Sequence, residues 1–174
     1  LEPRIAYNHR NLALALWRKG DSHQAAIHYE DSLRLDPNDT DVRLRLAEIY
    51  KEHDKPEQVL SHYRTVLESH PELWNIAHDL AWFIVNLKDE SLRDTAEAVR
   101  LAEYAVKMAP EETPVLLNTL AAAYAEASRF DDAVKSIDKS IVLARSIGRE
   151  DYVVKLMSTR ERYVRGESIR GKAR

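Results

Sequence analysis

Apolar residues recur along this 174-residue chain with a period of 34 residues. A Leu-Ala pair occupies positions 12–13, 46–47 and 80–81, and a fourth pair follows 40 residues later at 120–121. Three residues after each Ala stands another large side chain, which continues one face of an α-helix. These four positions are Leu16, Tyr50, Ile84 and Tyr124.

A second stripe of apolar or small residues recurs in the later half of each unit at the helical spacing i, i+4, i+7. Small side chains in such a stripe let two helices approach to about 8–10 Å. Each unit is therefore predicted to be a hairpin of two packed helices, in an all-α protein. The stripes are Ala25, Tyr29 and Ser32; Val59, Tyr63 and Val66; Ala98, Ala102 and Ala105; and Ala133, Ile137 and Ser140.

Polar residues and prolines mark the ends of the predicted helices. Asp21 is placed to cap the second helix, and Pro56 falls in the first turn of the fourth. The units run over about 6–39, 40–73, 74–112 and 114–147, and the third is lengthened by five residues around 86–94. This polar segment is interpreted as a tolerated insertion or, alternatively, as a contact with a partner.

The residues after 147 predict a capping helix and a tail. Gly148 breaks the chain, and Tyr152, Leu156 and Tyr163 mark the apolar side of a helix over about 149–165. Such a helix covers the end of the last unit. Residues 166–174, with two glycines and several basic side chains, are expected to be a flexible tail, whereas 1–165 is expected to form one domain.

These positions resemble the tetratricopeptide repeat family, whose pattern is W-x2-L-G-x2-Y, then A-x3-F, then P over 34 residues. The resemblance covers nearly the whole chain. The first aromatic of the pattern is replaced by His9, Arg43 and Ala77 in the first three units, and the small Gly is replaced by Ala throughout. The resemblance implies a right-handed α-solenoid of helix-turn-helix repeats.

In this family the first helix of each hairpin lines a concave groove that binds a partner peptide or segment. Aromatic and Arg side chains are the expected anchors. Trp17 and Trp82 are interpreted either as such anchors or as residues buried by packing. The expected groove residues are Tyr7, Arg10, Asn11, Leu14, Trp17, Leu44, Arg45, Glu48, Asn75, His78, Asp79, Trp82, Asn118 and Thr119.

Family members that hold the C-terminal carboxylate of heat-shock chaperones use a clamp of Lys, Asn, Asn, Lys and Arg. The matching positions here are Arg10, Leu14, Arg45, Asn75 and Asp79. Only the first keeps its charge type and the last is reversed, so a chaperone tail is not the expected ligand.

The composition argues against catalysis. The chain has no Cys, only four Gly, and neither a G-x-S-x-G nor an H-E-x-x-H motif. No two of its seven His stand at i, i+4, and His62, His70 and His78 are separated by the helix end at Pro71, so no metal site is expected. No enzyme activity, catalytic residue or cofactor is predicted.

Charge is unevenly distributed along the chain. From position 145 onward there are nine Lys or Arg against four Asp or Glu, and before it 17 against 25. The acidic body argues against nucleic acid as a partner. No run approaches the roughly 18 apolar residues that insert into a membrane. The absence of Cys suits the cytoplasm and does not exclude the periplasm.

The sequence therefore predicts a non-catalytic protein–protein interaction module with a protein or peptide partner. Two alternatives stay open. One is a docking or regulatory arm of a larger enzyme or membrane protein, for which the missing Met and the basic tail are the hints. The other is a scaffold that self-assembles into a homo-oligomer through repeat edges or the lengthened segment.

Overall fold

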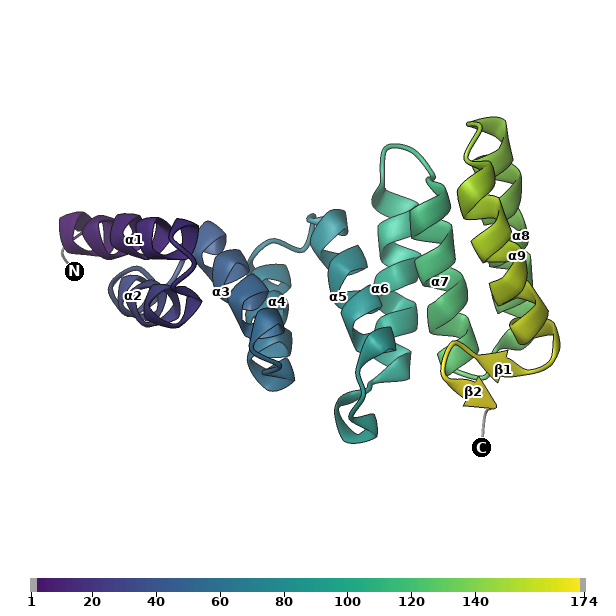
Figure 1. Cartoon of the computed structure of the whole chain (residues 1–174), viewed down its shortest axis with the longest axis horizontal. Coiled ribbons are helices and arrows are strands. Elements are labelled where there is room, and N and C mark those ends of the chain that lie inside the picture. Colours follow the sequence, from purple (N-terminus) through teal and green to yellow (C-terminus); the bar gives the residue numbers. More distant parts are fainter. Residues whose placement is uncertain (1–2, 173–174) are drawn as a thin grey trace. The chain divides into compact units, whose positions relative to one another are not determined.

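The computed structural model describes residues 3–172, which form nine α-helices, one 3₁₀ helix and one two-stranded hairpin (Figure 1). The all-α class expected from the sequence is confirmed. The chain divides into two compact units, a first unit that ends at Pro71 and a second unit that begins at Glu72.

The first unit consists of two helical hairpins, in which α1 packs against α2 and α3 against α4. The Leu-Ala pair of the second hairpin is fully buried, whereas in the first hairpin Ala13 is buried and Leu12 is 47% exposed. The helices are α1 (Pro3–Arg18), α2 (Ser22–Leu35), α3 (Thr40–Glu52) and α4 (Pro56–Ser69).

The second unit contains two further hairpins, α5 with α6 and α7 with α8, followed by α9. Both of its Leu-Ala pairs are buried. The elements are α5 (Trp74–Asn86), η1 (Glu90–Leu92), α6 (Thr95–Met108), α7 (Pro114–Glu126), α8 (Phe130–Ser146), α9 (Glu150–Val164), β1 (Glu167–Ser168) and β2 (Gly171–Lys172). No helix among residues 3–172 has both the length and the apolar character needed to cross a membrane.

Helix starts follow the expected capping chemistry. The Asp21 carboxylate accepts a hydrogen bond from the Gln24 backbone N–H at 3.1 Å, and Pro56 stands in the first turn of α4. Side-chain caps of the same kind begin α3, α6 and α7. Because a cap satisfies a backbone N–H that has no partner inside the helix, these residues fix where each helix begins.

A buried hydrogen bond is repeated in the first and the last hairpin. Ser32 Oγ donates to the Ala6 carbonyl at 2.9 Å, and Ser140 Oγ donates to the Pro114 carbonyl at 2.7 Å. Both serines belong to the stripe of small residues on the second helix of the hairpin. The hydroxyl therefore adds a helix–helix bond where the small side chain already permits close approach.

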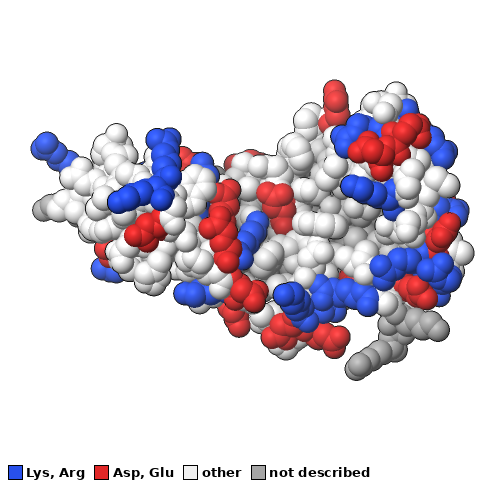
Figure 2. Space-filling model, viewed as in Figure 1, with Lys and Arg blue, Asp and Glu red and all other residues white. Residues whose placement is uncertain are grey.

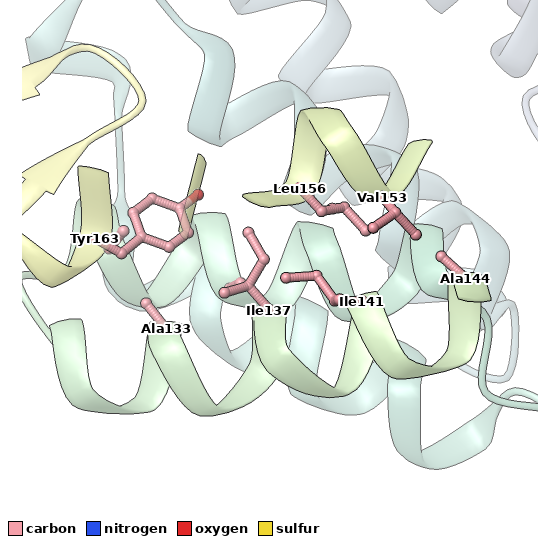
Figure 3. Close-up of a cluster of buried hydrophobic side chains, with 9 residues drawn as sticks. Ala133, Ile137, Ile141, Ala144, Val153, Leu156 and Tyr163 are labelled. Atoms are coloured by element: carbon pink, nitrogen blue, oxygen red, sulfur yellow. The ribbon is translucent and has the colours of Figure 1, made fainter. Parts of the chain in front are cut away.

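The helix α9 covers one face of α8, as expected for a capping helix. Val153, Leu156 and Tyr163 of α9 point towards Ile137 and Ile141 of α8, with Ala133 and Ala144 at the two ends of the cluster (Figure 3). Leu156 is 1% exposed, and Val154 on the opposite side of α9 is 68% exposed. The helix thus has one apolar face, and that face packs against α8.

The tail differs from the flexible segment expected from its composition. Residues 167–168 pair antiparallel with 171–172, and the Arg162 guanidinium donates to the Ser168 carbonyl at 2.7 Å. Ile169 packs against the α8–α9 core. Arg170 Nε also donates to the Val85 carbonyl of α5 at 3.3 Å. These contacts order most of the segment, while 173–174 lie outside the described residues.

The lengthened third unit is organised by one arginine. The Arg93 guanidinium donates to the Leu87 carbonyl through Nε and Nη2, at 3.1 and 2.9 Å. Its Nη1 lies 3.6 Å from Glu126 Oε2, and the two side chains are only 12% and 6% exposed. The inserted segment is therefore tied to α7 by a buried ion pair.

Candidate functional site

A pocket of about 380 Å³ opens on the first unit between α1, α2 and α3. We call it the α1–α3 pocket. Five of the expected groove residues line it, namely Arg10, Leu14, Leu44, Arg45 and Glu48. The remaining lining residues are Arg18, Tyr29, Asp41 and Val42.

The floor of the α1–α3 pocket is apolar. Tyr29 and Val42 are buried, and Leu14 and Leu44 are half-buried. Burial raises the pKa of the Tyr29 hydroxyl, although the positive charges of Arg45 and Arg10 act in the opposite direction. Tyr29 therefore stays neutral at ordinary pH and presents an aromatic ring with a hydroxyl to a ligand.

One side of the rim is an ion-pair network that joins α1 to α3. Arg10 Nη1 lies 2.9 Å from Asp39 Oδ2, and Arg10 Nη2 lies 3.0 Å from Asp41 Oδ2. Asp39 also caps α3 by accepting from the Val42 N–H at 3.1 Å. The guanidinium of Arg10 is therefore held in place by two carboxylates from the next hairpin.

The other side of the rim carries Arg45. Its Nη1 lies 2.9 Å from Glu48 Oε2, and its guanidinium lies 5.2 Å from the centroid of the Trp17 ring. The Arg45–Glu48 pair is about half exposed, so water screens it and a ligand carboxylate can compete for Arg45. Trp17 is half-buried beneath this cation.

Three of the groove residues expected on α1, namely Tyr7, Asn11 and Trp17, are not among the residues that line the pocket. Tyr7 is 62% exposed, and Asn11 is also exposed. Tyr7 and Asn11 are therefore available on the surface of α1.

The expected groove residues of α5 belong to the second unit. Trp82 is 41% exposed, which argues against the interpretation that packing buries it. Asn75 and Asp79 are exposed, and His78 is half-buried. Burial lowers the pKa of His78, opposed by the nearby charge of Asp79. The α5 surface therefore presents one large aromatic ring among polar groups.

The two groove residues expected on α7 lie among packed residues. The side chain of Asn118 is hydrogen-bonded to Tyr152 of α9. Thr119 is 2% exposed and contributes to the core, so its assignment to a surface is wrong. The reason is that α7 contacts α5, α6 and α8, which leaves nine of its thirteen residues buried.

Charged side chains of both signs are interspersed on the face shown in Figure 2. A nucleic-acid interface uses a basic face to neutralise phosphates. The mixed distribution on this face suits contacts with another protein surface better.

Two features of the first unit do not follow from sequence periodicity. Tyr29 was assigned to the packing stripe of its helix, and although it is only 2% exposed it also contributes to the lining of the pocket. His9 of α1 and His28 of α2 approach each other, with their Nδ1 atoms 3.1 Å apart. Such a pair across a hairpin has no short sequence spacing that would reveal it.

The sequence comparisons find one family and one long relative. The model of the family described as tetratricopeptide repeat matches residues 8–49. Superkiller protein 3 of Schizosaccharomyces pombe is 24% identical over 149 residues, which cover 83% of this chain and 10% of that protein. The chain thus spans about a tenth of the length of this relative.

Solved structures of similar fold cover nearly the whole chain. A tetratricopeptide repeat protein from Parabacteroides merdae has a TM-score of 0.71 at 16% identity, over 91% of this chain and 60% of that one. MamA from Desulfovibrio magneticus has a TM-score of 0.68 at 13% identity, over 92% and 95%. PilW, described as a type IV pilus biogenesis factor, has a TM-score of 0.61 at 19% identity, over 92% and 78%. At these identities the likeness is one of fold.

Proposed function

We propose, from the premise that the chain is a tetratricopeptide repeat protein, that it works by binding a segment of a partner protein. The observation that carries this proposal is the α1–α3 pocket, which combines an apolar floor with Arg side chains on its rim. Buried aromatic anchors and Arg are the residues that contribute most to binding energy at protein interfaces. No catalytic step is part of the proposal.

The pocket suits a segment that offers one apolar side chain and one carboxylate. The apolar group would lie over Tyr29 and Leu44, where it removes apolar surface from water. The carboxylate would replace that of Glu48 at Arg45, whose exposed pair is weak enough to be exchanged. Arg10 is already paired with Asp39 and Asp41, so it would form part of the pocket wall and would not make a new ion pair with the ligand.

We further propose that the surface of α5 is a second contact area. Trp82 carries this part of the proposal because a half-exposed indole can bury a large area at low entropic cost. Asn75, His78 and Asp79 would supply polar contacts around it. In the first unit, Tyr7 and Asn11 would extend the contact made at the α1–α3 pocket along α1.

The proposal is tested with a peptide selected from a random display library against the wild-type protein. Its affinity is then measured by calorimetry for wild type, Arg45→Glu and Trp82→Ala. Charge reversal at Arg45 is expected to weaken binding at least about tenfold, which is about 1.4 kcal/mol. Arg100→Glu on α6 is the matched control, because Arg100 is exposed and lies outside both contact areas.

Equal affinity for wild type and Arg45→Glu would exclude the α1–α3 pocket as the binding site. If Trp82→Ala alone weakened binding, the second contact area would be the site and the first would not.

A second candidate function is that of a docking or regulatory arm in a larger polypeptide. It is favoured by one observation, that the matched relative from Schizosaccharomyces pombe is about ten times longer than the aligned region. In this case the pocket would recruit a partner to an activity located elsewhere. Comparison of binding by the chain alone and within its full gene product separates the two candidates.

A further inference from the structure

We propose that His9, His28 and Asp31 of the first hairpin form a binding site for a divalent metal ion of the zinc class. Their ligand atoms all lie within 4.8 Å of one another. His9 comes from α1, whereas His28 and Asp31 stand three residues apart on α2 and therefore share one helix face. This site is separate from the α1–α3 pocket, which none of the three residues lines.

The distances between the ligand atoms suit a tetrahedral metal. His9 Nδ1 lies 3.1 Å from His28 Nδ1 and 3.6 Å from Asp31 Oδ2. Ligands at the usual zinc bond lengths of about 2.0–2.1 Å stand about 3.3 Å apart at the corners of a tetrahedron. These two distances lie on either side of this value, and the ligand atoms of His28 and Asp31 lie within 4.8 Å of each other, so the three side chains must rotate only to close this last separation.

The ligand types also select the metal. Two imidazole nitrogens with one carboxylate oxygen form a set preferred by zinc and by neighbouring ions such as nickel, copper and cobalt. Calcium and magnesium, in contrast, take oxygen ligands. Without a metal, one imidazole must donate a hydrogen bond to the other, since the two Nδ1 atoms face each other.

The surroundings hold the carboxylate in place and leave room for a further ligand. Arg34 Nη2 lies 2.9 Å from Asp31 Oδ1, which leaves Oδ2 directed towards His9. Hydrogen-bonding partners of this kind orient metal ligands. The side chains of His9 and Asp31 are 29% and 26% exposed, so solvent can supply the fourth ligand.

The next hairpin serves as an internal comparison. Thirty-four residues further on, the three positions hold Arg43, His62 and Thr65. The charge of Arg43 acts on His62, which indicates that the same two positions face each other there. A cation stands in place of the first ligand and a hydroxyl in place of the carboxylate. The hairpin geometry is shared, but only the first hairpin carries the ligands.

The test is a titration with zinc chloride of the whole chain, freed of metal with a chelator, by calorimetry and by thermal unfolding. Wild type is expected to bind one zinc ion per chain and to unfold at a higher temperature with zinc. His9→Ala, His28→Gln and Asp31→Asn should each weaken binding at least about tenfold and reduce the thermal shift. His23→Ala is the control, because His23 is an exposed histidine on the same helix and should leave both readouts unchanged.

Circular dichroism verifies that each variant is folded. Asp31→Asn keeps the shape of the side chain, so it still tests the site if a histidine variant does not fold. The proposal is overturned if wild type binds no zinc, or if folded His9→Ala and His28→Gln bind it as tightly as wild type. Half an ion per chain would indicate a bridge between two chains and would also overturn the site within one hairpin. Each outcome is independent of the peptide-binding proposal, because the peptide experiment uses other residues.

Discussion

At the level of single residues, most polar groups inside the hairpins are hydrogen-bonded, whereas a few are buried without a partner in the described part of the chain and lower the stability of the fold. Ser32 and Ser140 satisfy their hydroxyls by donating to a carbonyl of the facing helix. His62, by contrast, stacks on Tyr50 with ring centroids 5.5 Å apart, and its buried Nδ1 has no hydrogen-bond partner among the described residues. A buried polar atom of this kind is a site where stability depends on protonation.

The stability of the first unit is predicted to fall as the pH is lowered through the range of histidine titration. Burial lowers the pKa of His62 below its ordinary value of 6.5, and Arg43 acts in the same direction while Glu30 opposes it. Because His62 takes up a proton more readily in the unfolded chain than in the folded one, protonation favours unfolding. The contribution of neutral His62 to the free energy of unfolding is therefore fully present above pH 6.5 and is lost as the pH falls below it. Urea unfolding of wild type at a series of pH values measures this loss.

His62→Phe should reduce this pH dependence, because phenylalanine keeps the stacked ring and removes the titrating group. His23→Ala, which changes an exposed histidine, should leave the dependence as it is in wild type. If wild type and His62→Phe lose stability in parallel, His62 is not the group responsible.

At the level of helices and loops, the sequence predicted the four hairpins and the terminal helix because the Leu-Ala pairs and small-residue stripes directly reflect helix packing. It did not predict the C-terminal hairpin. Glycine and basic residues at 166–172 indicate flexibility by composition, whereas the packed side chain of Ile169 and one hydrogen bond each from Arg162 and Arg170 order them. Such long-range contacts leave no periodic pattern in the sequence.

The capping role of α9 predicts a sharp contrast between its two faces. Leu156→Ala is expected to destabilise the second unit by about 2–5 kcal/mol, because it leaves a cavity between α8 and α9. Val154→Ala, on the exposed face, should change the free energy of unfolding by no more than about 0.5 kcal/mol. Denaturant unfolding monitored by circular dichroism compares the two, and similar effects for both would contradict the packing shown in Figure 3.

The stability of the lengthened third unit is predicted to depend on Arg93. Arg93→Ala leaves Glu126 buried without its cation and frees the Leu87 carbonyl, so a loss of about 3 kcal/mol is expected. Arg100→Ala on the exposed side of α6 is the control and should have little effect. Denaturant unfolding gives both values, and a loss for Arg93→Ala as small as that for Arg100→Ala would mean that the ion pair does not hold the segment.

At the level of the whole molecule, the resemblance to tetratricopeptide repeats predicted the class of protein better than the individual site residues. Arg10, Leu14 and Arg45, which were predicted to line a groove, all line the α1–α3 pocket because they project from the first helices of adjoining hairpins, and their contact with a partner stays a prediction. Thr119 was wrongly placed because α7 is packed on most of its surface, and a repeat pattern does not report how many neighbours a helix has. The pairing of His9 with His28 depends on the facing of two helices and was missed for the same reason.

The central claim, that the first unit binds a partner segment at the α1–α3 pocket, can be tested with the chain's three tryptophans. Each indole N–H gives one signal in a nitrogen–proton correlation spectrum, and the three signals can be assigned with single Trp→Phe variants of Trp17, Trp74 and Trp82. On addition of the selected peptide, the Trp17 signal should shift in wild type and Arg100→Glu, and Arg45→Glu should need at least about ten times more peptide for the same shift. A peptide that binds while the Trp17 signal stays in place, or that shifts it in Arg45→Glu at the same concentration as in wild type, would contradict binding at the α1–α3 pocket.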